Sequence, residues 1–118
     1  MSDEPDWARP VVHWDLQARN PEAQRAFYAS LFNWEIGEGF VMAIPPGVGG
    51  PLPGPGGHII AGEPGFAIYV QVRDLRATLA RTAELGGKVA GEPFDVPDGP
   101  TIAPIADPEG NRLILVQQ

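Results

Sequence analysis

The chain has 118 residues, enough for one compact domain, and a formal net charge of −7. Its eight basic residues are scattered singly, which argues against nucleic acid and anionic membranes as partners, because phosphate binding needs clustered Lys and Arg. The absence of cysteine excludes disulfides, thiolate nucleophiles and Cys-ligated zinc. No apolar run approaches the roughly 20 residues that cross a bilayer, and no signal-peptide pattern opens the chain, so we expect a cytoplasmic protein.

Residues 1–9 are predicted to be a polar tail, and residues 10–118 a single domain. Apolar and polar residues alternate over 10–18, which predicts a strand. Asn20 is expected to cap a helix that begins at Pro21, where the missing N–H of proline is harmless, and ends near Leu31.

The next segment is predicted to form a hairpin of strands 34–36 and 40–44, and a later strand at 58–62. Between them, residues 45–57 contain five prolines and six glycines, a density that excludes regular structure. This long loop is either a lid over a binding site or a solvated connection, and the sequence leaves both open.

The pattern then restarts. Residues 66–72 are predicted to be a strand, and Asp74 is expected to cap a helix that ends at Gly86-Gly87. Further strands are expected at 88–90, 94–96, 101–106 and 112–117.

The two halves match without a gap when the chain is shifted against itself so that His13 falls on Ala67. The expected N-caps coincide, and the identical pairs are Gln17/Gln71, Arg19/Arg73, Ala23/Ala77, Ala26/Ala80, Ala29/Ala83 and Leu31/Leu85. Each half has one amphipathic helix and about four strands, too little to bury both faces alone. The repeat therefore predicts an α+β domain of two tandem modules, at about 10–62 and 66–118.

Alternation along the strands assigns side chains to two faces. The face under the helices is predicted to hold Trp14, Leu16, Ile59, Ala61, Ile68, Val70, Leu113 and Leu115, packed against Phe27, Leu31, Leu79 and Leu85. The other face is predicted to hold His13, Asp15, Gln17, His58, Ile60, Ala67, Tyr69, Gln71, Arg112, Ile114 and Val116, joined by Phe40 and Met42. An apolar wall with a few convergent polar groups is typical of a ligand pocket.

The polar residues of this second face have two interpretations each. His13 is either a hydrogen-bonded interior histidine or a residue that contacts ligand or transfers a proton. Asp15 and Arg112 form a structural ion pair or grip a substrate. Gln17 and Gln71 pair with each other across the pseudo-twofold axis or contact ligand.

Tyr69 either hydrogen-bonds a ligand or packs by its ring. The candidate catalytic residues are thus His13 and Asp15. The candidate ligand-binding residues are Gln17, Phe40, Met42, His58, Tyr69, Gln71 and Arg112.

Several motifs resemble the vicinal oxygen chelate superfamily of glyoxalases, bleomycin resistance proteins and extradiol dioxygenases. They are Phe27-Tyr28-Ala29-Ser30-Leu31-Phe32-Asn33-Trp34, Val72-Arg73-Asp74-Leu75, Leu85-Gly86-Gly87-Lys88-Val89 and Asp107-Pro108-Glu109-Gly110-Asn111-Arg112. The resemblance covers about 10–117. It implies paired βαβββ modules forming one curved mixed sheet around a central cavity, and a homodimer, although an acidic monomer stays open.

The resemblance also implies where a metal would bind in metal-dependent members. Their ligands are a His or Gln on the first strand, a Glu on the fourth, a His on the fifth and a Glu on the eighth. By position these correspond to His13, Ile60 (or its neighbour His58), Ala67 and Ile114. Because the apolar residues cannot coordinate, no metal or other cofactor is predicted; a divalent metal held by His13, His58 and Asp15 is the alternative.

The first functional hypothesis is therefore a glyoxalase-like or bleomycin-resistance-like protein that binds a small molecule without the superfamily's metal. The alternative is a glyoxalase-like lyase or isomerase, or another enzyme, that uses His13 with or without a metal. A structural or regulatory subunit with an empty cavity is a third hypothesis.

Overall fold

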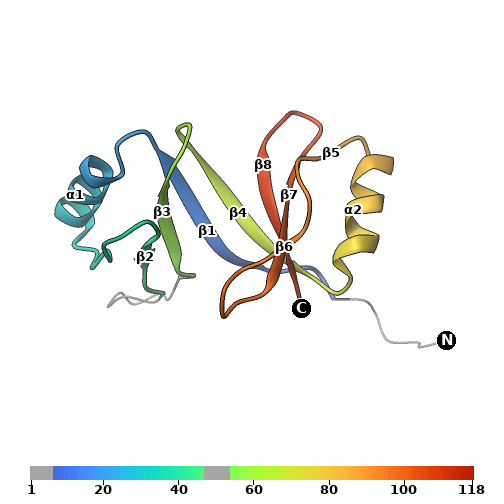
Figure 1. Ribbon diagram of the computed structural model, residues 1–118, viewed down its shortest axis with the longest axis horizontal. Helices are drawn as coiled ribbons and strands as arrows, with labels where there is room; N and C mark the ends of the chain where they lie inside the picture. The colour runs from blue at the N-terminus through green and yellow to red at the C-terminus, as the bar shows by residue number, and fades with distance from the viewer. Residues whose placement is uncertain (1–6, 47–53) are drawn as a thin grey trace.

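The computed structural model describes residues 7–46 and 54–118. Its elements in chain order are β1 (Val11–Ala18), α1 (Pro21–Phe32), β2 (Met42–Ile44), β3 (Gly57–Ala61), β4 (Gly65–Val72), α2 (Leu75–Glu84), β5 (Lys88–Val89), β6 (Phe94–Asp95), β7 (Thr101–Ala106) and β8 (Arg112–Gln117). The molecule is elongated, with extents of 51 × 32 × 29 Å, and the two helices lie at opposite ends of a twisted sheet (Figure 1).

Both helices begin at the predicted caps. The side chain of Asn20 accepts a hydrogen bond from the backbone N–H of Ala23 at 3.2 Å, and Asp74 accepts one from Ala77 at 3.1 Å. These contacts satisfy donors that have no partner inside the helix. Neither helix of the described chain has the length and apolarity that crossing a bilayer requires.

The strands form one mixed sheet in the order β2-β3-β1-β4-β8-β7-β5, with β6 paired to β7. The antiparallel pair β1–β4 joins the two halves, and outside it β3 runs parallel to β1 and β8 runs parallel to β4. The chain order on the two sides of the β1–β4 pair is therefore related by a pseudo-twofold axis. The predicted α+β fold with a curved mixed sheet is confirmed.

The register of the outer strands differs between the two halves. Asp15 on β1 is paired with His58 on β3, and Tyr69 on β4, the repeat equivalent of Asp15, is paired with Ile114 on β8. His58 is therefore the structural equivalent of Ile114, whereas the gap-free sequence alignment places Ile60 on Ile114. That alignment was wrong by two positions for the last strand of each half.

The segment between α1 and β2 differs from the predicted hairpin. Residues 34–36 form no strand, and the strand expected at 40–44 is limited to Met42–Ile44. The buried side chain of Ile36 packs into the core instead, and the N–H of Gly37 donates to the carbonyl of Ala43 at 2.9 Å. Most of the predicted loop 45–57 lies outside the described residues, so the alternatives of a lid and a solvated connection both stay open.

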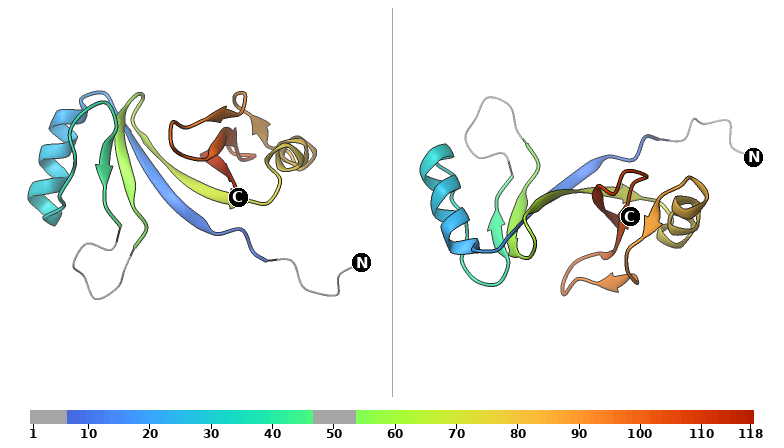
Figure 2. Two further views of the ribbon diagram at one scale, coloured as in Figure 1. Left: turned by 60° about the horizontal axis from the view of Figure 1, so that its bottom comes forward. Right: turned by 90° about the horizontal axis from the view of Figure 1, so that it is seen from above.

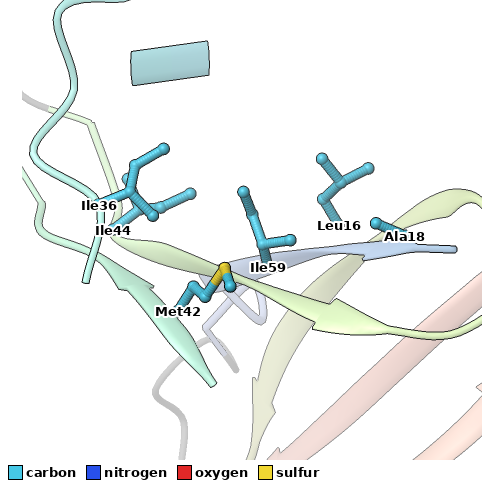
Figure 3. Close-up of a cluster of buried hydrophobic side chains, with 6 residues drawn as sticks. All are labelled: Leu16, Ala18, Ile36, Met42, Ile44 and Ile59. Carbon is cyan, nitrogen blue, oxygen red and sulfur yellow. The ribbon is translucent and has the colours of Figure 1, made fainter. Parts of the chain in front are cut away.

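One hydrophobic core lies under α1. Leu16, Ala18, Ile36, Met42, Ile44 and Ile59 are all at most 7% exposed, and Tyr28 and Ala29 of α1 pack against them (Figure 3). The prediction that Met42 joins the opposite face was wrong. Met42 pairs with Ile59 across β2 and β3, and directly opposed residues share one face of a sheet.

The second half carries clusters on both faces. Val72, Leu75, Leu79, Ala103 and Leu115 are buried together, and a separate cluster contains Ala67, Ile102, Ile114 and Val116. The first cluster includes residues of α2, so it marks the helix side. The second shares the alternation phase of His13 and Asp15, and Tyr69 packs against it.

Five residues predicted in the core are exposed instead, namely Phe27, Leu31, Ala61, Ile68 and Leu85. Figure 2 shows the two helices at the far ends of the sheet, with β1 and β4 running between them. Neither α1 nor α2 covers the middle of the sheet, and Ile68 of β4 is 42% exposed. The sequence pattern identified apolar faces but not how far apart the two helices lie.

Candidate functional site

Five polar side chains from four neighbouring strands meet on the sheet. They are His13 and Asp15 of β1, His58 of β3, Tyr69 of β4 and Arg112 of β8. We call these five residues the polar cluster. All five were predicted on one face by strand alternation.

Asp15 is the centre of the polar cluster and is only 2% exposed. The phenolic O–H of Tyr69 donates to its Oδ2 at 2.8 Å, and one guanidinium nitrogen of Arg112 donates to the same oxygen at 3.3 Å. A second nitrogen of Arg112 donates to Oδ1. A buried carboxylate is costly unless it is paired and hydrogen-bonded, and these contacts satisfy both requirements. The structure thus shows the ion pair that was one of the two interpretations of Asp15 and Arg112.

The two histidines lie against each other. Nε2 of His13 is 2.9 Å from Nδ1 of His58, and Nε2 of His58 is 3.9 Å from Oδ2 of Asp15. Burial lowers the pKa of both imidazoles, because it disfavours the charged form, and the negative charge of Asp15 only partly offsets this effect. For His58 the neighbouring His13 and Arg112 lower the pKa further.

Tyr69 is held as a neutral hydrogen-bond donor. Burial, and then its hydrogen bond to Asp15, raise the pKa of the phenol well above its ordinary value of 10.0. Its ring lies edge-on to the ring of His13, with 4.9 Å between centroids. The hydroxyl is therefore engaged by Asp15, and the ring packs against the imidazole.

The remaining candidate residues lie elsewhere. Gln17 is paired with Gly65, six residues along β4 from Gln71, which is roughly 20 Å at the rise of a strand. The predicted pairing of Gln17 with Gln71 was therefore wrong. Phe40 lies outside any strand and is 79% exposed, and Met42 is in the core under α1.

The hollows of the described surface include one beside α1 and one beside β4. One of about 440 Å³ lies between α1 and the segment 34–37, and its lining includes Arg25 and Trp34. Another of about 250 Å³ lies where the start of β4 faces the β7–β8 turn, and its lining includes Ala67 and Arg112. Neither hollow is lined by His13 or His58, so the predicted central cavity is not among them. The second hollow reaches the polar cluster through Arg112.

The polar cluster does not fit the metal set that the superfamily resemblance implies. The register places His13, His58, Ala67 and Ile114 at the four implied positions, so the first half offers two imidazoles and the second half offers no donor. Asp15 is already bound by Arg112 and Tyr69. Within residues 7–46 and 54–118, no three His, Cys, Asp or Glu side chains are arranged to hold a metal ion.

Sequence reasoning identified the members of the polar cluster, and offered the ion pair of Asp15 with Arg112 as one of two interpretations, but it missed the other contacts. Asp15 and Tyr69 are equivalent in the sequence repeat, and residues related in this way lie diagonally across the β1–β4 pair. That diagonal was a usable signal for the hydrogen bond between them. The contact of His13 with His58 depends on the two-residue register shift of β3, for which the sequence carries no evident signal.

The family described as "Glyoxalase-like domain" matches residues 11–116 of the chain. The protein named "Putative glyoxylase CFP32" of Mycobacterium tuberculosis is 29% identical over 132 residues, which cover 99% of this chain and 49% of that protein. The counterpart in Mycobacterium bovis gives the same values. The chain therefore spans about half the length of these curated relatives.

Solved structures show the same fold at low identity. A glyoxalase/bleomycin resistance protein/dioxygenase superfamily member from Vibrio splendidus has a TM-score of 0.64 and 15% identity, with 93% of this chain and 98% of that chain covered. The Mn(II)-bound glyoxalase from Novosphingobium aromaticivorans has a TM-score of 0.60 and 20% identity, with 92% and 38% covered. Together with the family match over nearly the whole length, these similarities show that the chain belongs to the glyoxalase-like domain family of the vicinal oxygen chelate superfamily.

Proposed function

We propose that the chain binds a small organic molecule at the polar cluster without a divalent metal at the superfamily positions. The observation that carries this proposal is the state of Asp15, whose two carboxylate oxygens are both taken by protein donors. An acid that is held by three donor contacts in this way is a structural anchor. Asp15 therefore holds Arg112 and Tyr69 in place, and is assigned no catalytic role.

Two further features support a binding site here. The polar groups converge from four strands, a rigid setting for positioning a ligand. Apolar side chains of the same sheet face, among them Ala67 and Ile114, lie beside the polar groups, and sites with apolar walls and few polar groups suit small molecules. The relatives and solved neighbours named as glyoxalases are consistent with a small-molecule ligand.

A second candidate function is a proton-transfer enzyme that uses His13. Burial keeps this imidazole neutral near pH 7, the form in which it can accept a proton. A glyoxalase-like lyase or isomerase without a metal belongs to this class.

A thermal-shift screen with small, partly apolar compounds tests the binding proposal. Compounds that raise the melting temperature are then retested on His13→Ala and on Gln24→Ala, which removes a half-buried polar side chain from α1. The stabilisation should be lost in His13→Ala and retained in Gln24→Ala. Uniformly absent shifts, or hits that both variants bind equally, would contradict the proposal.

A further inference from the structure

The contact between the two histidines limits which of their ring nitrogens can carry protons. Nε2 of His13 and Nδ1 of His58 are 2.9 Å apart, a hydrogen-bond distance. A neutral imidazole carries one ring proton, on one of its two nitrogens. One histidine therefore donates and the other accepts, and two arrangements are possible for the pair.

Asp15 selects between the two arrangements. Its carboxylate, which only accepts hydrogen bonds, lies 3.9 Å from Nε2 of His58. A proton on this nitrogen is attracted to the carboxylate, whereas a lone pair there is repelled by it. His58 therefore carries its proton on Nε2, and its Nδ1 accepts the hydrogen bond from Nε2–H of His13.

The tautomer of His13 also determines the state of its other ring nitrogen, Nδ1. Because Nε2 of His13 holds the proton, Nδ1 has a lone pair. Across the residues that the structure describes, this nitrogen takes part in no hydrogen bond with the protein, and no side-chain nitrogen or oxygen is both buried and without a partner. Nδ1 of His13 is therefore not fully buried and has no protein partner among the described residues.

We infer that Nδ1 of His13 is the atom of the site that accepts a hydrogen bond from the ligand, and that the ligand is a small molecule without negative charge that donates an N–H or O–H to it. His58 and Asp15 act as positioning residues that fix the tautomer. This inference rests on the proposed small-molecule function and specifies its ligand class.

The charges around the site exclude an anionic ligand class. Arg112 is paired with Asp15, and the hydroxyl of Tyr69 donates to the same carboxylate. The polar cluster therefore offers an acceptor without an unbalanced positive charge. The net charge of −7 on the whole chain adds long-range repulsion of anions.

Nitrogen NMR of the ¹⁵N-labelled protein tests the tautomers directly. At about pH 7.5, above the ordinary pKa of imidazole, the spectrum of both histidines should show a proton on Nε2 and no proton on Nδ1. A spectrum that places the proton of His13 on Nδ1 would overturn the inference, whether or not the protein binds small molecules.

Phenol and anisole form a matched pair of probes, because they share a ring and only phenol has an O–H. Titration with phenol should move the Nδ1 resonance of His13 toward the hydrogen-bonded range, and anisole should leave it unchanged. If both compounds shift resonances of the polar cluster but neither moves Nδ1 of His13, small-molecule binding stands and the ligand class is wrong. If phenol moves no resonance of the cluster, the inference fails, while the compound screen still decides the proposed function.

Discussion

Arg112 on β8 holds the buried carboxylate of Asp15 on β1, across the intervening strand β4. The two residues are 97 positions apart in the sequence, and their contact ties the first half of the domain to the last strand. Because Asp15 is nearly inaccessible to water, removing its partner would leave an uncompensated buried charge, which costs more than breaking an exposed ion pair.

Replacing Arg112 should destabilise the fold. Arg112→Met leaves the carboxylate of Asp15 buried with only Tyr69 as a donor, and we expect a loss of about 2–3 kcal/mol in the free energy of unfolding. The matched control is Arg19→Met, since Arg19 pairs with Glu63 on the surface at 3.0 Å and the two side chains are 74% and 85% exposed. For the control, urea denaturation should show a change in the free energy of unfolding below about 0.5 kcal/mol. Equal effects of the two substitutions would contradict this account of Asp15.

Tyr69→Phe removes one hydroxyl from the same carboxylate. We expect it to lower the free energy of unfolding by about 1.5–3 kcal/mol, the range for a hydrogen bond to a charged group. Tyr28→Phe is the control, because Tyr28 packs its ring against Trp34 and its hydroxyl bonds to none of the described residues. Chemical denaturation measures the free energy of unfolding of both variants. If Tyr69→Phe leaves that free energy unchanged, the hydroxyl does not support Asp15.

Stability should fall as the pH drops below about 6.5, the ordinary pKa of histidine. Burial lowers the pKa of His13 and His58 in the folded state, so the unfolded chain binds protons first. Unfolding is then favoured progressively from the ordinary pKa down to the lowered values, and above that window the stability is fully retained. Unfolding free energies measured between about pH 8 and 5 should show this slope.

The double variant His13→Gln/His58→Gln provides the control for that slope. It should flatten the pH dependence of the unfolding free energy in this window, because no imidazole remains to titrate. A slope of the same size in the double variant would assign it to other groups.

Gly57 is a site of close packing between β3 and β1. A Cβ added there would lie 2.4 Å from the ring of Trp14, so Gly57→Ala should cost about 1–3 kcal/mol through overpacking. Gly65 in β4 has nothing within 4 Å of its added Cβ, and Gly65→Ala should be nearly neutral. Melting temperatures that drop equally in both variants would contradict the packing of Trp14 on β3.

The sequence predicted the fold more completely than the site. Local signals, such as the caps Asn20 and Asp74 and the alternation along β1 and β4, depend on neighbouring residues and were confirmed. The misplacement of Met42 and Ile60 came from strand register, which is set by pairing between distant segments. The contact of His13 with His58 has the same origin, because a two-residue slip would separate the rings.

Metal analysis of the purified protein tests the central claim most directly. The account predicts far less than one divalent ion per chain by mass spectrometry, and no change in melting temperature with a chelator, because Ala67 and Ile114 provide no ligand and Asp15 is held by Arg112. Close to one nickel, zinc, iron or manganese ion per chain, lost in His13→Ala, would contradict it.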